Sequence, residues 1–512
     1  MRRDTLLRQG STWALVAISP LLVLLVAEHS VALALALVGG VGALALVAFL
    51  VGSRSGMFWI AGLLIATVLL LPADLSLHFR IPLGGGGVFI IDVLLALLLA
   101  SWFVNALAEG SFRFARSPAT LPLALFLCWV AFAGLLGLEH GNDLKYVLQD
   151  IRGLAYYVLL LWVLSQVRSR REILLWLKVL AGCLLVGFAI GVYYSVSGRG
   201  LALTYVESGV SRFPAPAEVF QVSTALAATY LVIWPRGQHR PLLLWVVLVV
   251  SLLAVMLSYV RGFWIGLAVG FVYLLFVLRT PQRFRLVVGT VLLLALVIGG
   301  MAAVRPTLVD SLVTRASSAT LYGNDPSIQY RLIEDKAVEA QVRQSPILGK
   351  GLGAFYLFDF SRYGVAPFEK NYIHNNYLWF AQRVGLVGLA LFLWLIAAFL
   401  FGGRGAGSIF SAQDPWLGGL VVGSRVVLVT SLVVSMSSPQ FNSKGSVAVI
   451  AMLMGLAEVA KSLSRQSSGV TQDARGEDPV SVEPSSTLAT SSSWRSGARS
   501  VPTPHRSGDP RS

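Results

Sequence analysis

Charged residues and cysteines are both scarce in this sequence. Only 13% of its 512 residues are charged, whereas 56% are hydrophobic, and the mean hydropathy is +0.74. A soluble protein has no interior large enough for so much apolar surface, so the composition indicates a polytopic membrane protein. The two cysteines, Cys128 and Cys183, both lie inside apolar runs. They predict buried small side chains, with no disulfide and no metal site.

Several functional motifs are also absent. No cluster has metal-ligand spacing and no Asp-x-Asp pair stands at a membrane edge, which disfavours a metal-dependent sugar transferase; we expect neither a metal nor a cofactor. The run Gly349-Lys350-Gly351-Leu352-Gly353 lacks the strand, helix and Ser/Thr context of a nucleotide-binding loop, so it predicts tight backbone turns packed closely over the membrane domain. No internal repeat and no matched pair of broken helices is visible, which argues against an inverted-repeat transporter.

Long apolar segments dominate what is present. Each is long enough, or nearly so, to cross a bilayer, and each crossing must be a helix because lipid cannot satisfy backbone polar groups. We expect an all-α transmembrane bundle of about 12–14 spans. The fourteen candidate segments are 12–27, 31–51, 57–72, 88–107, 119–138, 154–167, 173–196, 218–234, 241–258, 262–278, 286–304, 376–401, 416–437 and 445–461, the sixth with a possible earlier start near Tyr146.

The distribution of Lys and Arg predicts the orientation. If the N-terminus is cytoplasmic, fifteen basic residues fall on inside segments and seven on short outside loops, as the positive-inside rule requires. Arg2, Arg3 and Arg8 precede the first apolar run, no convincing cleavage site follows, and we expect a retained first span. The net charge of +15 is then explained by the membrane setting, and no nucleic-acid partner is expected.

The chain divides into four predicted parts. Residues 1–304 carry eleven spans, 305–375 form one large external loop with short helices, 376–461 carry three spans, and 462–512 form a Ser-, Arg- and Pro-rich tail. The tail is too polar to bury a core, so we expect it to be disordered and cytoplasmic. Both termini would then be cytoplasmic and the large loop periplasmic or external.

Four arginines depart from the orientation rule. Arg152, Arg212, Arg261 and Arg331 lie near predicted outer ends of spans or in the outer loop. Charges at a membrane edge are functional candidates, and the planar guanidinium suits phosphate oxygens. The alternative is that they snorkel to lipid headgroups or pair with Asp150, Glu207 or Glu218.

His374 is the histidine best placed for catalysis. A neutral imidazole can take a proton from an attacking hydroxyl as a general base. Asn375 and Asn376 follow it and can cap a helix whose N-terminus favours a neutral imidazole; a purely structural histidine at a helix start is the alternative. Several loop carboxylates could orient His374 or act as the base instead: Glu334, Asp335, Glu339, Asp359 and Glu369. The sequence predicts an amphipathic helix from about Ile328 to Gln344, and we expect its solvated face to carry Glu334, Asp335 and Lys336.

Over residues 240–400 the sequence resembles the O-antigen ligase and polymerase superfamily of bacterial membrane glycosyltransferases. The resemblance depends on the order and spacing of several short motifs. These are Ser258-Tyr259-Val260-Arg261-Gly262, Arg331 followed by Pro346 and the glycines Gly349, Gly351 and Gly353, His374-Asn375-x-Tyr377-Leu378, Gly385-x-x-Gly388, and more loosely Phe213-Pro214-Ala215-Pro216.

The resemblance implies a donor in which a polyprenyl diphosphate carries a glycan. It also implies metal-independent transfer outside the inner membrane to a lipid or sugar hydroxyl. The family's two essential arginines would fall on Arg261 and Arg331 and its loop histidine on His374, with Asn375, Tyr377, Gly351 and Gly353 as supporting motif residues. Arg383 is a departure, because many members carry an acidic residue in the histidine's helix; this puts a role for an acid there in doubt.

The sequence therefore predicts a glycan ligase. A polymerase of the same superfamily, or a flippase for lipid-linked sugars, are the alternatives, and a flippase has no need for a base. The expected partners are the lipid-linked donor, a lipid or glycan acceptor and membrane lipids in a bacterial inner membrane. Arg212 and Arg152 are additional candidates for the donor diphosphate.

Overall fold

The computed structural model describes residues 54–71, 80–83, 86–110, 115–197, 224–225, 242–278, 280–304, 306–317, 326–361, 364–402 and 415–476. Three predicted spans, 12–27, 31–51 and 218–234, lie wholly or mostly outside this part, and so does Arg212. Residues 1–466 form one compact unit, to which the description below applies.

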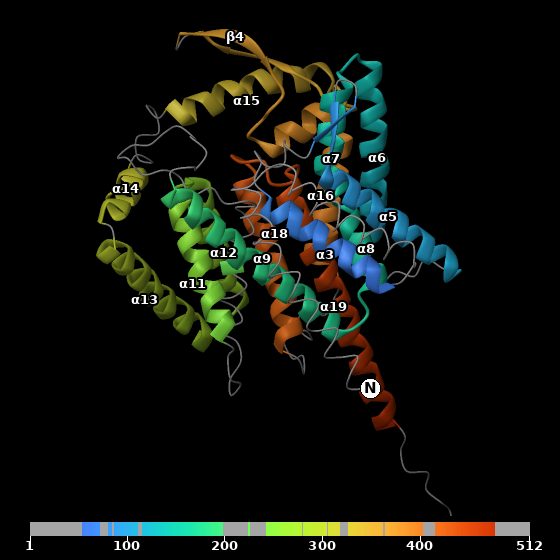
Figure 1. Ribbon diagram of the computed structural model, residues 1–512, viewed down its shortest axis with the longest axis vertical. Helices are drawn as coiled ribbons and strands as arrows, with labels where there is room; N and C mark the ends of the chain where they lie inside the picture. Colours follow the sequence, from blue (N-terminus) through green and yellow to red (C-terminus); the bar gives the residue numbers. More distant parts are fainter. Residues whose placement is uncertain are drawn as a thin grey trace, which may run out of the picture. The chain divides into compact units, whose positions relative to one another are not determined.

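Helices dominate the described residues. Eight are long and apolar enough to cross a membrane, and three shorter apolar helices accompany them, so the expectation of a polytopic helical membrane protein is confirmed (Figure 1). The eight candidate spans are Ile90–Leu107, Thr120–Glu139, Leu144–Gln166, Arg170–Tyr194, Thr280–Val304, Asn376–Phe401, Trp416–Val434 and Lys444–Ser464. The three shorter helices are α3 (Arg54–Leu70), α11 (Leu242–Leu257) and α12 (Arg261–Val277). These eleven helices coincide with eleven of the fourteen predicted segments.

The long helices begin where local chemistry favours a helix start. α6 spans Thr120–Glu139 and α7 spans Leu144–Ala155, and the Asp143 side chain caps α7 by accepting from the backbone N–H of Lys145. α9 (Arg170–Val196) begins with a capping box in which Ser169 and Glu172 exchange hydrogen bonds, the arrangement that satisfies two otherwise unpaired backbone donors. A turn at Tyr156 and Tyr157 separates α7 from α8 (Val158–Gln166), so the sixth span does begin earlier than its apolar core.

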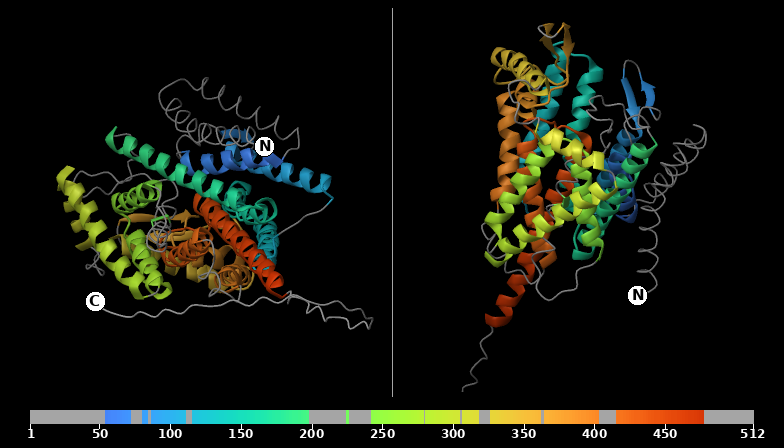
Figure 2. Two further views of the ribbon diagram at one scale, coloured as in Figure 1. Left: turned by 90° about the horizontal axis from the view of Figure 1, so that it is seen from below. Right: turned by 90° about the vertical axis from the view of Figure 1, so that its left-hand side faces the viewer.

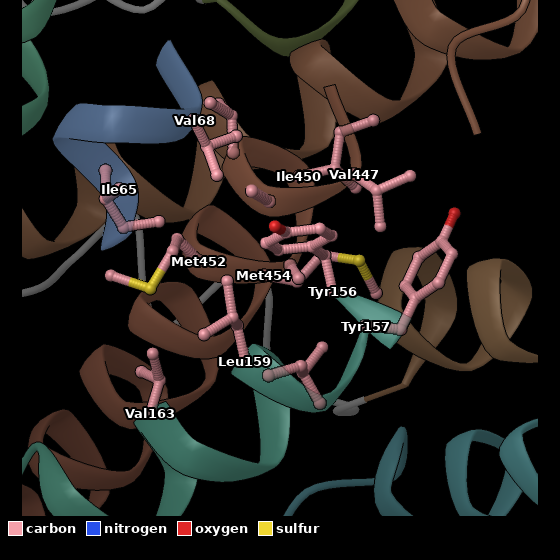
Figure 3. Packing of buried hydrophobic residues seen from close by; sticks show 14 of the residues in the cluster. Ile65, Val68, Tyr156, Tyr157, Leu159, Val163, Val447, Ile450, Met452 and Met454 are labelled. Atoms are coloured by element: carbon pink, nitrogen blue, oxygen red, sulfur yellow. The ribbon is translucent and has the colours of Figure 1, made fainter. Parts of the chain in front are cut away.

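The core lies where helices from both halves of the sequence meet. Figure 3 shows side chains of α3, α8 and α19 (Lys444–Gly476) packed around the turn that carries Tyr156 and Tyr157. Gly455 allows α19 to approach α8 closely, because a Cβ there would lie 2.7 Å from Cβ of Val163. Small residues at such contacts let helix backbones approach, which matters most where lipid supplies no hydrophobic driving force.

α12 packs against α18 (Pro415–Val434), and α6 packs against α16 (Asn376–Phe401). At the first contact a Cβ on Gly266 would lie 2.6 Å from Cγ2 of Val434. At the second, a Cβ on Gly388 would lie 2.7 Å from Cδ1 of Trp129. Larger side chains at either glycine would therefore push the helices apart.

Charged groups separate to two ends of the helices. At one end Arg54 pairs with Glu172 at 2.9 Å and Arg168 with Glu109 at 3.4 Å. At the other end lie the first residues of α16 and two elements of the predicted external loop, α15 (Pro326–Gln344) and the hairpin of β3 (Tyr356–Phe360) and β4 (Val365–Lys370) (Figures 1 and 2).

Two small hairpins were not predicted. β1 (Arg80–Leu83) pairs antiparallel with β2 (Gly86–Phe89), just before α5 (Ile90–Ala108). β3 and β4 also pair antiparallel, with a bulge near Phe358 and Phe360. Strands of four to six residues are too short for a clear alternating pattern, and Pro367 suits only an edge strand.

The predicted loop, residues 305–375, contains helices as expected. It follows α13 (Thr280–Val304) and begins with α14 (Pro306–Ser317). The next helix, α15, covers the amphipathic helix predicted over residues 328–344. At the other end of the chain α19 continues to Gly476, into the segment predicted as a tail; residues 477–512 lie outside the described part.

Candidate active site

His374 lies between β4 and α16, directly before the residue that caps α16. The Asn375 side chain accepts from the backbone N–H groups of Tyr377 and Leu378, at 3.1 and 3.4 Å. The cap is the one predicted from the sequence. The Tyr377 hydroxyl donates to the carbonyl of Leu432 at 2.7 Å and ties the start of α16 to α18. His374 is therefore held at a fixed helix start with its side chain one quarter exposed.

Glu334 of α15 is the partner of His374. The carboxylate is completely buried, and its Oε2 atom accepts from the backbone N–H of His374 at 2.9 Å and lies 2.7 Å from Nδ1 of the same residue. The other oxygen, Oε1, is contacted by the Tyr356 hydroxyl at 2.7 Å and by Nζ of Lys370. Both oxygens thus have two partners, as a buried charge requires.

The charge on Glu334 decides which ring nitrogen of His374 carries the proton. Burial alone would raise the pKa of Glu334, but the hydrogen bond and charge of His374 and the hydrogen bond from Lys370 outweigh it and lower that pKa to about 2. An ionised carboxylate can only accept, so Nδ1 of His374 must donate to it. The neutral imidazole then has its lone pair on Nε2, the atom that faces away from Glu334.

The prediction of a solvated face for Glu334 is wrong. Tyr330, Ile333, Ala337 and Val338 pack in the core or against it, and Glu334 falls among these apolar positions at helical spacing. A carboxylate on the apolar face of an amphipathic helix was the signal that could have identified it. Lys336 and Glu339 are exposed, as is Asp359, which bonds only to Ser361 nearby; Glu369 is also exposed.

Asp335 is half-buried next to the helix cap of α16. Burial raises the pKa of Asp335, and a hydrogen bond with the Asn375 side chain opposes that rise. One of its oxygens, Oδ1, is buried with no hydrogen-bond partner among the described residues. Asp335 thus supports the residue next to His374, and among the five loop carboxylates only Glu334 forms a hydrogen bond with His374 itself.

Lys370 supplies the positive charge that balances Glu334. Its ammonium lies over the rings of Tyr330, Phe358 and Tyr372, at 4.7, 5.2 and 5.6 Å from their centroids, and the Tyr330 hydroxyl is 3.0 Å away. Cation–π contacts of this kind stabilise a charge that is shielded from water. Lys370 therefore compensates part of the charge on the buried Glu334, and His374 contributes through its own hydrogen bond and charge.

Residues 435–442, the loop between α18 and α19, connect His374 to Arg261. The backbone N–H of Asn376 donates to the carbonyl of Ser435 at 2.8 Å, and the N–H of Phe441 donates to Oδ1 of Asn376 at 2.8 Å. On the other side of this loop, a Cβ on Gly262 would lie 3.1 Å from Oγ of Ser437. The first residues of α12 and α16 thus contact one short segment, which brings Arg261 and His374 to one region.

Arg261 is the first residue of α12, and the chain reverses immediately before it. Tyr259 has a φ of +51°, a left-handed conformation that is uncommon for a residue other than glycine. Such conformations are retained where the surrounding structure requires them, and they concentrate at functional sites. The short Tyr259-Val260 connection fixes where Arg261 enters the helix.

Arg331 shares a face of α15 with the partner of His374. It precedes Glu334 by three residues and Asp335 by four, and residues at these spacings lie next to each other on a helix surface. The preceding residue, Tyr330, has its ring centroid 6.1 Å from that of His374. Arg331 therefore lies on the helix that carries the partner of His374, whereas Arg261 is linked to the histidine through residues 435–442.

Arg152 makes a different set of contacts. Its Nε atom bonds Oδ1 of Asp92 at 2.7 Å, a second nitrogen donates to the carbonyl of Gly87 at 3.2 Å, and the guanidinium lies 4.7 Å from the Phe89 ring centroid. Arg152 thus pairs with a carboxylate, but with Asp92, which was not among the predicted partners Asp150, Glu207 and Glu218; Asp150 pairs with Arg383 instead. The adjacent Gly153 is in close contact with Asn442, so α7 also reaches residues 435–442.

The glycine run is packed against three helices, as its sequence predicted. Gly349, Gly351 and Gly353 have φ values of +77°, +78° and +80°. A Cβ on Gly351 would lie 2.3 Å from Cα of Gly137, and one on Gly353 would lie 2.7 Å from the backbone nitrogen of Val147. Glycine is required at these positions by both conformation and space.

Arg383 locks the same loop in place. It is fully buried and donates to Asp150 at 2.6 Å and to the carbonyls of Ala354 and Asn371. Asp150 also accepts from the backbone N–H of Gly353 at 2.7 Å. The positive charge that departs from the family pattern is thus used to join α7, the glycine loop and the residues that lead to His374.

α16 is interrupted at Gly385, which has φ +67° and ψ 179°. The helical hydrogen bonds lost there are replaced by the glycine loop, since Lys350 donates to the carbonyl of Gln382 and Leu386 donates to that of Pro346. Trp129 donates to the carbonyl of Val384 at 2.8 Å. The Gly385-x-x-Gly388 motif therefore creates a broken helix whose free backbone groups hold the external segment.

Among the described residues, no three His, Cys, Asp or Glu side chains lie close enough to hold a metal ion. The groups around His374 that can act chemically are its oriented imidazole, the Glu334–Lys370 ion pair and, on the same helix as Glu334, Arg331. Arg261 lies at the start of α12, which contacts the loop that binds Asn376.

Residues 246–393 match a family model described as O-Antigen ligase, a range that includes Arg261, Arg331, Glu334 and His374. A search of the curated proteins found no match.

Proposed function

From the match of residues 246–393 to the O-antigen ligase family model, we propose that this chain belongs to that superfamily and transfers a glycan from a polyprenyl diphosphate carrier to a hydroxyl acceptor. The reaction takes place at the outer face of a bacterial inner membrane. His374 is the general base, and Arg261 and Arg331 bind the diphosphate of the donor.

The proton transfer follows from the orientation of His374. Nε2 accepts the proton of the acceptor hydroxyl while that oxygen attacks the anomeric carbon of the donor sugar. The bond between the anomeric carbon and the diphosphate oxygen breaks, and polyprenyl diphosphate leaves with the bonding electrons. Glu334 stabilises the imidazolium that forms, which later releases its proton to solvent. Direct attack of this kind inverts the configuration at the anomeric carbon.

The arginines act on the leaving group. Negative charge builds up on the diphosphate as its bond to the sugar breaks, and guanidinium groups fixed beforehand stabilise that charge without reorganisation. Arg331 is assigned this role because it lies on α15, the helix that carries Glu334, and α15 packs against α16. Arg261 is assigned it because the residue that follows it, Gly262, contacts the loop between α18 and α19, which also binds Asn376. Arg152 and Arg212, which lies outside the described residues, are secondary candidates.

The single observation that supports transfer over transport is the hydrogen bond between Glu334 and His374, 2.7 Å long. A flippase needs cations for the diphosphate but no oriented base. A buried carboxylate that fixes the histidine tautomer is the arrangement that general-base catalysis uses.

Replacing His374 by Ala in cells tests the proposal. The expected result is normal amounts of protein in the membrane, loss of the surface glycan, and accumulation of the lipid-linked donor on the outer leaflet. Accumulation on the inner leaflet would instead indicate a flippase. Lys336 provides the control, because it is an exposed charged residue on the same helix as Glu334. Lys336→Ala is expected to leave the surface glycan unchanged.

A further inference from the structure

Tyr372 is an aromatic side chain beside His374 that the proposed mechanism does not use. Its ring centroid lies 4.9 Å from that of His374, with the two rings perpendicular. Almost half of the side chain, 48%, is exposed. Tyr330, whose ring also contacts that of His374, is less exposed.

The backbone of Tyr372 is held by a hydrogen bond from a buried side chain. Its carbonyl oxygen lies 2.9 Å from the hydroxyl of Tyr356, a buried residue that also contacts Glu334. The ammonium of Lys370 lies 5.6 Å from its ring centroid. The half-exposed ring therefore stands at a defined place next to the proton acceptor.

We propose that Tyr372 is an acceptor-binding residue, whose ring stacks against the sugar ring of the acceptor. This rests on the proposed function. The C–H groups of a pyranose carry partial positive charge, and the face of an aromatic ring is negative. The centroids of the Tyr372 and His374 rings are 4.9 Å apart, so a sugar whose hydroxyl reaches His374 has its own ring within reach of Tyr372.

A membrane role is the competing explanation for an exposed tyrosine at this end of the molecule, since aromatic residues are enriched at membrane interfaces. Such a role predicts no contact with sugars and no effect on the acceptor. Leu357 is the control residue for this distinction. It is 60% exposed on β3 and lies between the buried Tyr356 and Phe358, so its side chain lies on the face of the hairpin opposite to theirs.

The first experiment measures sugar binding without turnover. Methyl glycosides of glucose, galactose, rhamnose and N-acetylglucosamine are added to the protein in lipid nanodiscs, and saturation-transfer difference NMR records the contact of each sugar with the protein. We expect a signal from the ring C–H protons of at least one sugar. It should fall about fivefold in Tyr372→Ala, remain in Tyr372→Phe and Tyr372→Trp, and remain in Leu357→Ala. No signal from any of the four sugars, or a signal unchanged in Tyr372→Ala, would overturn the inference.

The second experiment uses the transfer reaction. In Tyr372→Ala the KM for the acceptor should rise about tenfold, while kcat and the KM for the donor stay within about twofold. A change in the donor KM alone would contradict the assignment to the acceptor. The experiments distinguish the general-base hypothesis from the acceptor-binding hypothesis. Full transfer by His374→Ala would reject His374 as the base, and the NMR signal would report independently whether Tyr372 binds a sugar.

Discussion

At the scale of single residues, the hydrogen bond between Glu334 and His374 is the interaction on which catalysis depends. The carboxylate holds the proton on Nδ1 and leaves the lone pair on Nε2. An amide in place of the carboxylate can donate to Nδ1 and so favour the opposite tautomer, in which Nε2 carries the proton and cannot act as a base.

We predict that Glu334→Gln lowers kcat by about 10²- to 10⁴-fold and leaves the KM for the donor within about twofold. Steady-state kinetics on the purified protein would measure both. Glu339→Gln is the matched control, because Glu339 lies on the same helix and forms only a surface pair with Arg343. Equal activity of the Glu334 variant and the wild type would show that the carboxylate has no part in orienting the base.

The pKa of Glu334 predicts how stability depends on pH. Because its pKa falls from the ordinary value of 4.5 to about 2 on folding, the ionised group stabilises the folded state above pH 4.5. This contribution is lost as the pH falls towards 2. The Tm difference between wild type and Glu334→Gln should therefore shrink as the pH falls from about 4.5 towards 2. A difference that stays constant over this acidic range would contradict the assigned ionisation.

At the scale of elements, the break in α16 determines how the external segment is attached. Gly385 adopts a φ/ψ combination available essentially only to glycine, and a Cβ there would lie 2.1 Å from the carbonyl oxygen of Ile347. The free backbone groups on both sides of the break bind residues 346–350. The broken helix thus connects the membrane span to the loop that carries α15.

Gly385→Ala is expected to destabilise the protein by at least about 3 kcal/mol, seen as reduced amounts in the membrane and a lower Tm. Gly289→Ala on α13 should be neutral or slightly stabilising, because nothing lies within 4 Å of its added Cβ and alanine favours a helix. A Gly385→Ala protein with wild-type Tm would mean that α16 can run straight without losing the loop.

Some elements could be predicted from sequence and others could not, for physical reasons. Spans such as Thr120–Glu139 are specified by local hydropathy, and the cap at Asn375 by a local motif. The partner of His374 is 40 residues away, and charge alone suggested a solvated Glu334. The break at Gly385 depends on hydrogen bonds from residues 346–350, and Arg383 pairs with Asp150 across 233 positions; no local pattern encodes either contact.

At the scale of the whole molecule, the proposal requires the end that carries α15 and His374 to face outward. Cysteine labelling of a chain lacking Cys128 and Cys183 tests this. A membrane-impermeant thiol reagent should label Asp359→Cys on the β3–β4 hairpin and leave Arg171→Cys, at the start of α9, unlabelled. The reverse pattern would place His374 in the cytoplasm.

The central claim is that an oriented His374 catalyses glycan transfer. The most direct measurement is transfer by the purified protein in nanodiscs, supplied with a polyprenyl-diphosphate-linked glycan and saccharide acceptors. We predict glycosylated acceptor with inverted anomeric configuration for the wild type and loss of at least about 10³-fold in rate for His374→Ala. Undiminished transfer by His374→Ala would contradict the account.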